Sequence, residues 1–167
     1  MLRSLGADAV EVRKADQLAG LDGLVIPGGE STAFTRLMDL YGLDEAIRDF
    51  RGPVFGTCAG MIVLDRDHLG LVDIGVRRNA FGRQVASFET DLELPGEGKP
   101  LRAVFIRAPW IDEVGPEVEV LAEVDGHPVL ARQGRFLVAA FHPELTDDAR
   151  LHELFLETVK EGRLVRA

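Results

Sequence analysis

The residue with the clearest chemical potential is Cys58, the only cysteine among 167 residues. It lies in the run Gly-Thr-Cys-Ala-Gly, residues 56–60, directly after a short apolar segment. A strand that ends in a tight turn of small residues before a helix exposes a nucleophile, a geometry known as a nucleophile elbow. Far downstream, the run Phe-His-Pro-Glu, residues 141–144, follows a second apolar segment. A thiol, an imidazole and a carboxylate are therefore available for one site.

His142 and Glu144 stand two residues apart, so in an extended segment their side chains share a face. Pro143 favours extended backbone angles at His142. The imidazole would exchange a proton with the thiol and with a leaving amine, while the carboxylate would hold the ring, as in a Ser-His-Asp triad. We therefore predict a catalytic triad of Cys58, His142 and Glu144 that hydrolyses a carboxamide through a thioester and releases ammonia.

A second glycine turn, Pro-Gly-Gly-Glu-Ser at residues 27–31, also follows an apolar segment. In an open α/β sheet, ligands gather at the carboxyl ends of the strands, where both turns would lie. The backbone N–H groups of Gly29 and Ala59 would then converge on the carbonyl oxygen of the substrate. We therefore predict an oxyanion hole at these two residues. The loss of one such hydrogen-bond donor typically raises the reaction barrier by about 3 to 4 kcal/mol.

The elements needed to position these groups are those of an α/β fold. Two buried strands, residues 21–26 and 54–55, each lead through a glycine turn into a helix, which predicts a parallel sheet. After residue 69 the pattern changes to strands with hairpin turns at 124–127 and 133–135. We predict a flavodoxin-like, doubly wound, mostly parallel sheet with an antiparallel extension. The expected helices are 32–50, 61–64 and 148–161, and the later strands 71–76, 84–89, 102–106, 118–124, 129–133 and 136–141.

The opening residues depart from that plan. Residues 1–5 are typical of the last turn of a helix that Gly6 closes, and residues 9–13 of a short strand. In the flavodoxin-like order the first strand lies inside the sheet, and no segment before residue 9 supplies one. These 167 residues therefore lack the first strand, which we interpret as omitted residues or as truncation at an internal methionine, rather than as a fold that tolerates the gap.

Composition limits the functional classes. With 46% hydrophobic and 28% charged residues, the chain fits one soluble domain over residues 1–167. A net charge of −9 with scattered arginines argues against nucleic-acid binding, and no apolar run approaches the roughly 20 residues of a membrane span. One cysteine cannot form an internal disulfide, which favours the cytoplasm. His68, His127 and His152 lack metal-ligand spacing, so we predict no metal and no cofactor.

The three motifs, in their order and contexts, resemble those of class I, triad-type glutamine amidotransferases. Two further runs, Arg-Asn-Ala-Phe-Gly-Arg-Gln at 78–84 and Phe-Ile-Arg-Ala-Pro at 105–109, are similar to the glutaminase subunits of pyridoxal 5′-phosphate synthase. The resemblance covers essentially the whole chain. It implies hydrolysis of L-glutamine to glutamate, with ammonia channelled to a separate (β/α)8 synthase subunit in a hetero-oligomer that builds this form of vitamin B6.

The resemblance also implies which residues contact glutamine. Cys58, His142 and Glu144 match the catalytic positions, and an arginine fork suits the substrate α-carboxylate because it can bind bidentately. The family begins with a strand and a Gln-Gly segment that helps to form the oxyanion region, and nothing in this sequence corresponds to it. The implied substrate-binding residues are Gly28, Gly29, Glu30, Ser31, Arg78, Ile106 and Arg107.

Two other functions stay open on the sequence alone. The chain could be a class I amidotransferase subunit, or a hydrolase with a similar elbow, that serves another biosynthetic partner; residues 78–84 argue against this. It could also be a catalytically impaired binding or regulatory subunit, against which the intact triad argues. Ammonia release measured with and without the synthase subunit distinguishes these alternatives.

Overall fold

The structure is a computed structural model that describes residues 1–29, 38, 40–81, 87–96 and 98–164. Its largest sheet has five strands in the order β1-β2-β9-β8-β7. The first three are parallel to one another, while β9, β8 and β7 pair antiparallel. The predicted α/β class with an antiparallel extension is confirmed. The strands are β1 Leu24–Ile26, β2 Val54–Thr57, β9 Phe136–Ala139, β8 His127–Gln133 and β7 Glu119–Val124.

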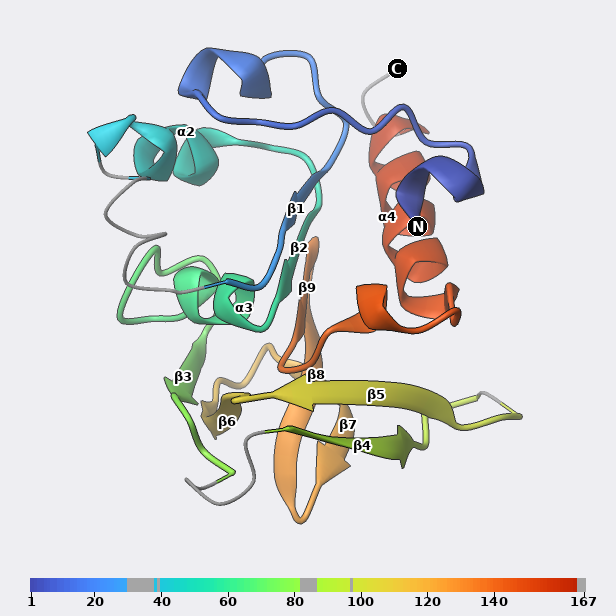
Figure 1. Cartoon of the computed structure of the whole chain (residues 1–167). Helices are drawn as coiled ribbons and strands as arrows, with labels where there is room; N and C mark the ends of the chain where they lie inside the picture. Colours follow the sequence, from blue (N-terminus) through green and yellow to red (C-terminus); the bar gives the residue numbers. More distant parts are fainter. Residues whose placement is uncertain (30–37, 39, 82–86, 97, 165–167) are drawn as a thin grey trace.

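Helices cover both faces of the parallel part (Figure 1). Helices α2, Leu43–Asp49, and α3, Ala59–Leu64, lie on one side, and α4, Arg150–Leu164, lies on the other. All four residues of β2 are buried, as expected for a strand between two helical layers. No helix in the described part of the chain is long and apolar enough to cross a membrane.

Two antiparallel ribbons lie near the carboxyl ends of the parallel strands (Figure 1). One pairs β3, Ile74–Arg77, with β6, Trp110–Val114, and the other pairs β4, Ser87–Leu92, with β5, Leu101–Ile106. The second ribbon is tied to the parallel sheet because the N–H of His142 donates a hydrogen bond of 2.9 Å to the carbonyl of Val104 in β5. These ribbons therefore border the end of the sheet where the motifs lie.

The hairpin predictions are confirmed. Val124 pairs with His127 across a two-residue turn in which Asp125 and Gly126 have φ angles of 51° and 78°. Positive φ at both positions is the requirement of a type I′ turn, which an Asp-Gly pair meets at low cost. Gly134, with φ of 54°, makes the turn between β8 and β9. Local turn chemistry therefore fixes the antiparallel extension.

Three local predictions need correction. The helix expected over 32–50 is interrupted, because Gly42 adopts a left-handed φ of 63° before α2 begins. Residues 30–37 and 39 lie outside the described residues. Strand β6 was not predicted, and its pairing with β3 brings Asp112 within 2.6 Å of Arg77. Residues 9–13 form no strand, because no strand lies beside them to supply hydrogen bonds.

Residues 1–23 contain two 3-10 turns, η1 Leu2–Leu5 and η2 Ala15–Leu18, and no strand. Gly6 closes η1 with a φ of 82°.

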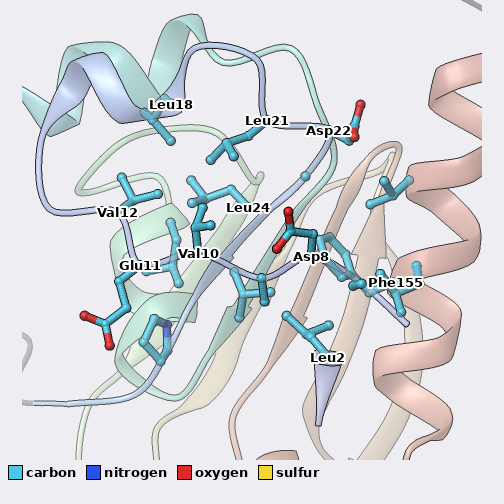
Figure 2. Close-up of a pocket in the computed structure, with 18 of the residues that line it drawn as sticks. Leu2, Asp8, Val10, Glu11, Val12, Leu18, Leu21, Asp22, Leu24 and Phe155 are labelled. Carbon is cyan, nitrogen blue, oxygen red and sulfur yellow. The ribbon is translucent and has the colours of Figure 1, made fainter. Parts of the chain in front are cut away.

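A cavity of about 920 Å³ lies beside β1, between α2 and α4 (Figure 2). It occupies the place beside β1 that the flavodoxin-like order gives to its first strand. Its lining is largely apolar and includes Val10, Val12, Leu24, Leu43, Phe155 and Val159.

The close packing of α3 on the sheet depends on glycine. A Cβ at residue 60 would overlap the carbonyl oxygen of Ile26 in β1, and a Cβ at residue 56 would stand 2.7 Å from the carbonyl oxygen of Gly60. Real Cβ atoms do not tolerate backbone at these separations, so only residues without a side chain fit. The two glycines that flank Cys58 therefore let the helix begin directly above the strands.

We expect Gly60→Ala to destabilise the protein by about 1 to 3 kcal/mol, because overlap with a strand backbone cannot be relieved by side-chain rotation. This cost exceeds the gain of about 1 kcal/mol that alanine brings to a helix. Gly98→Ala is the matched control, since a Cβ at that residue meets nothing within 4 Å. Urea unfolding of both variants measures the effect, and equal stability of the two would contradict this account of the packing.

Candidate active site

Cys58 occupies the turn between β2 and α3 in a strained backbone conformation. Its φ is 50° and its ψ is −106°, a region that non-glycine residues seldom occupy and that costs about 1 to 3 kcal/mol. The turn is held from the sheet, because the Cys58 N–H donates a hydrogen bond of 2.7 Å to the carbonyl of Ala139 in β9. Such strain at the end of a parallel strand is the geometry of the nucleophile elbow that the motif predicts.

The imidazole of His142 lies between the other two groups of the predicted triad. Its Nδ1 is 2.8 Å from Oε1 of Glu144, and the ring also hydrogen-bonds the side chain of Cys58. Since Nδ1 is used by the carboxylate, Nε2 is left for the sulfur. The His142 side chain is 14% exposed and that of Glu144 is 40% exposed. The structure therefore brings together three groups from two distant segments of chain.

The local backbone differs from the extended segment expected at residues 141–144. Pro143 begins a 3-10 turn, η3 Pro143–Leu145, and the N–H of Leu145 donates a hydrogen bond of 3.2 Å to the carbonyl of His142. Proline suits the first position of a helical turn because the missing N–H is not needed there. The turn folds Glu144 back toward the ring of His142, so these two side chains meet although the segment is not extended.

Electrostatics favour a charged imidazole at this site. The hydrogen bond with Cys58 and then that with Glu144 raise the pKa of His142 from 6.5 to about 10, against the opposing effect of burial. Burial acts to raise the pKa of Glu144, but hydrogen bonds from His142 and from the backbone outweigh it and lower that pKa. An imidazolium next to the sulfur provides the ion-pair partner that a thiolate nucleophile needs.

The first glycine turn packs directly against the triad. A Cβ at residue 28 would overlap Cε1 of His142 and would stand 3.1 Å from its Nδ1 and 3.2 Å from the Cβ of Cys58. The two glycine turns are therefore neighbours, as the topology predicts. Gly29 is exposed, and Ala59 is 2% exposed as the first residue of α3.

The other predicted substrate-binding residues that the structure describes lie at the end of β5 and on two loops that are joined to each other. Ile106, at the end of β5, is 39% exposed, and Arg107 follows it with a positive φ of 44°. The loop that carries Arg78 is joined to this loop by a hydrogen bond of 3.1 Å from the N–H of Ala80 to the carbonyl of Ala108. Glu30 and Ser31 lie outside the described residues.

Sequence reasoning missed the backbone acceptors that hold the site. The carbonyls of Ala139 and Val104 anchor the N–H groups of Cys58 and His142, respectively. No residue type marks a backbone carbonyl, so the sequence carries no signal for this role.

Among the described residues, no three His, Cys, Asp or Glu side chains gather as ligands for a metal ion. The chemistry that the described groups support is nucleophilic attack by a thiol with acid-base assistance.

Comparison with known proteins gives matches over nearly the whole chain. The model of the SNO glutamine amidotransferase family matches residues 1–161. The pyridoxal 5′-phosphate synthase subunit PdxT of Niallia circulans is 55% identical, with 98% of this chain and 91% of the relative covered. PdxT of Geobacillus thermodenitrificans is also 55% identical, with 98% and 89% covered. A crystal structure of a glutamine amidotransferase superposes with a TM-score of 0.89 at 47% identity, covering 95% of this chain and 90% of that one.

We expect Glu144→Gln to lower the pKa of His142 from about 10 toward its ordinary value of 6.5, because an amide does not stabilise the imidazolium as a carboxylate does. Cys58→Ala should lower this pKa as well, since it removes the hydrogen bond with the largest effect. Proton NMR titration of the His142 ring measures both shifts. An unchanged His142 pKa in either variant would contradict the geometry described above.

We expect Gly28→Ala to slow alkylation of Cys58 by iodoacetamide at pH 7 by about tenfold, because the new methyl group displaces the imidazole from the sulfur. The chain has one cysteine, so the rate of alkylation reports on this thiol alone. Gly98→Ala serves again as the control with an unobstructed Cβ. Equal rates for the two variants would show that residue 28 does not constrain the triad.

Proposed function

This chain belongs to the SNO glutamine amidotransferase family, and we propose that residues 1–167 act as one glutaminase domain with a Cys-His-Glu triad. The chain is the glutaminase subunit of a pyridoxal 5′-phosphate synthase, an assignment that rests on PdxT relatives 55% identical over 98% of its length. The single observation that supports the proposed mechanism is the hydrogen-bonded contact of His142 with both Cys58 and Glu144.

In the proposed reaction, the Cys58 thiolate attacks the carboxamide carbon of L-glutamine. Negative charge then develops on the carbonyl oxygen, where the N–H groups of Gly29 and Ala59 would stabilise it. The imidazolium of His142 gives its proton to the leaving nitrogen, so ammonia departs and a thioester with Cys58 remains. His142 next removes a proton from a water molecule that attacks the thioester. Glutamate is released and the pair of Cys58 thiolate and His142 imidazolium is restored, while Glu144 keeps the ring oriented throughout.

We propose that the loops around the triad bind the amino-acid part of glutamine. Arg78 and Arg107 lie on two hydrogen-bonded loops, and an arginine there could hold the α-carboxylate with two parallel hydrogen bonds. Ile106 borders these loops and would contact the aliphatic part of the substrate. Gly28 leaves the space that the ring of His142 fills, and Glu30 and Ser31 complete the proposed substrate contacts.

The partner that we propose is the (β/α)8 synthase subunit of pyridoxal 5′-phosphate synthase, in a hetero-oligomer through which ammonia is channelled. The names of the PdxT relatives support a synthase partner in kind. We also propose that the chain acts in the cytoplasm, because a catalytic cysteine must stay reduced and reducing compartments keep thiols free.

We expect Cys58→Ala to lower ammonia release from glutamine by at least about a thousandfold, since no other group can form the thioester. The assay couples ammonia to glutamate dehydrogenase and is run with and without the synthase subunit. The unsubstituted chain should form a complex with the synthase and release ammonia faster in its presence. Cys58→Ala should still form the complex, because the substitution changes only a buried side chain.

Two outcomes would overturn the proposal. Ammonia release that persists in Cys58→Ala would exclude the thiol as nucleophile. An unsubstituted chain that neither binds the synthase nor responds to it would exclude the proposed partner, and the chain would then serve another synthase or act as a binding subunit.

A further inference from the structure

Two buried polar atoms stand out in the described part of the chain, because neither has a hydrogen-bond partner: Oγ1 of Thr57 and Nδ1 of His152. Thr57 is 2% exposed and His152 is 5% exposed. An unsatisfied buried polar group costs about 1 to 3 kcal/mol, so native proteins nearly always provide a partner, which is often an internal water molecule. The pair lies outside the groups that the proposed mechanism uses.

Both atoms lie on the same side of the sheet. Side chains alternate along β2, and a Cβ at Gly56 would point at α3, where it would meet Leu64. Phe55 and Thr57 therefore face the opposite layer, which is formed by α4. This is where the ring of Phe55 contacts the ring of His152 edge-on, with 5.9 Å between ring centroids. Thr57 lies two residues after Phe55 on the same face of β2 and is the last residue of the strand, directly before Cys58.

The same region contains the acid of the triad. Glu144 and His152 interact electrostatically, and each acts on the pKa of the other. Burial lowers the pKa of His152, so its ring is neutral at physiological pH and one nitrogen can accept a hydrogen bond. The two unpartnered atoms, at the end of β2 and in the first turn of α4, thus belong to the layer between the sheet and α4, and Glu144 of η3 is near enough to His152 to interact with its ring.

We propose that Thr57, His152 and the Glu144 carboxylate bind one internal water molecule, and that Thr57 and His152 act through it as positioning residues for Glu144. The hydroxyl of Thr57 donates to the water oxygen. The water donates one hydrogen to Nδ1 of His152 and the other to the carboxylate. Three partners are typical of a buried water. This link connects the strand that carries the nucleophile with the acid that orients the base.

This inference rests on the proposed function, because a positioning role requires that Glu144 orient His142. In metal sites, removal of the groups that orient the ligands typically costs tenfold or more in activity, and we expect an effect of this size for groups that orient Glu144. Such a group affects the orientation of the triad and leaves substrate contacts intact. The expected signature is therefore a lower kcat with an unchanged KM.

The test uses substitutions that keep shape and remove a hydrogen-bonding atom. His152→Phe retains a ring against Phe55, whereas His152→Asn keeps a polar atom near the position of Nδ1. Thr57→Val removes the hydroxyl at constant shape, and Thr57→Ser retains it. In the complex with the synthase, we expect His152→Phe and Thr57→Val each to lower kcat for glutamine about tenfold. His152→Asn and Thr57→Ser should restore most of the rate.

The double variant Thr57→Val/His152→Phe gives the sharpest result. If both residues act through one water, the second substitution adds nothing, so kcat should equal that of either single variant. Losses that multiply, or failure of His152→Asn to restore the rate, would show that the two side chains contribute only independent packing, and would overturn the proposal.

A second measurement does not depend on catalysis. A high-resolution crystal structure of the unsubstituted chain should show one ordered water within hydrogen-bond distance of Oγ1 of Thr57, Nδ1 of His152 and the Glu144 carboxylate. Without that water the proposal fails even if the chain is an active glutaminase. If the water is present but the complex releases no ammonia, the proposed function fails while the binding site for the water stands. This measurement also decides the question if a variant does not fold.

Discussion

The contact between the first turn of α3 and the backbones of β1 and β2 is the constraint on which the rest of the site depends. It leaves no room for a side chain at Gly60 and little at Gly56, so the chain must turn within one residue between strand and helix. That residue is Cys58, and its left-handed backbone is the result. The strain is sustained because β2 is buried on both faces and the Cys58 N–H is bonded to the neighbouring strand. A rigid sheet therefore holds the thiol in a conformation that the local sequence would not choose alone.

Charge balance at His142 follows from this placement. The imidazole is bonded on one side to the sulfur and on the other to Glu144, and both contacts favour its protonated form. Gly28 packs so closely against the ring that a Cβ at this residue would overlap it. A protonated imidazole suits the proposed reaction, in which the first step needs a thiolate and the second needs a proton for the leaving amine. The antiparallel ribbon of β4 and β5 completes the arrangement by anchoring the His142 backbone.

The edge of the sheet formed by β1 is packed less closely than the centre around β2. Beside β1, apolar residues from two helical layers line a cavity of about 920 Å³ (Figure 2), whereas the core around β2 is filled with closely packed side chains. Apolar surface without packed neighbours contributes little stability, so this edge is the part of the sheet that should open most easily. The triad lies on the side of β1 where the strands are paired. Its geometry therefore depends on β2 and β9 more than on the edge.

Local chemistry in the sequence was sufficient for the features that depend on a few neighbouring residues. The Asp-Gly and Gly turns of the hairpins and the tight turn at Cys58 could be predicted, because each follows from the conformational range of its own residues. Tertiary structure decided what depends on distant partners. Residues 9–13 form no strand because no strand lies beside them. The acidic segment Trp110–Val114 is a strand because β3 lies beside it and supplies hydrogen bonds. Likewise, the sequence contained His142 and Glu144, but only the fold placed them in a turn against Cys58, since hydrogen bonds between distant segments form only after the chain has brought those segments together.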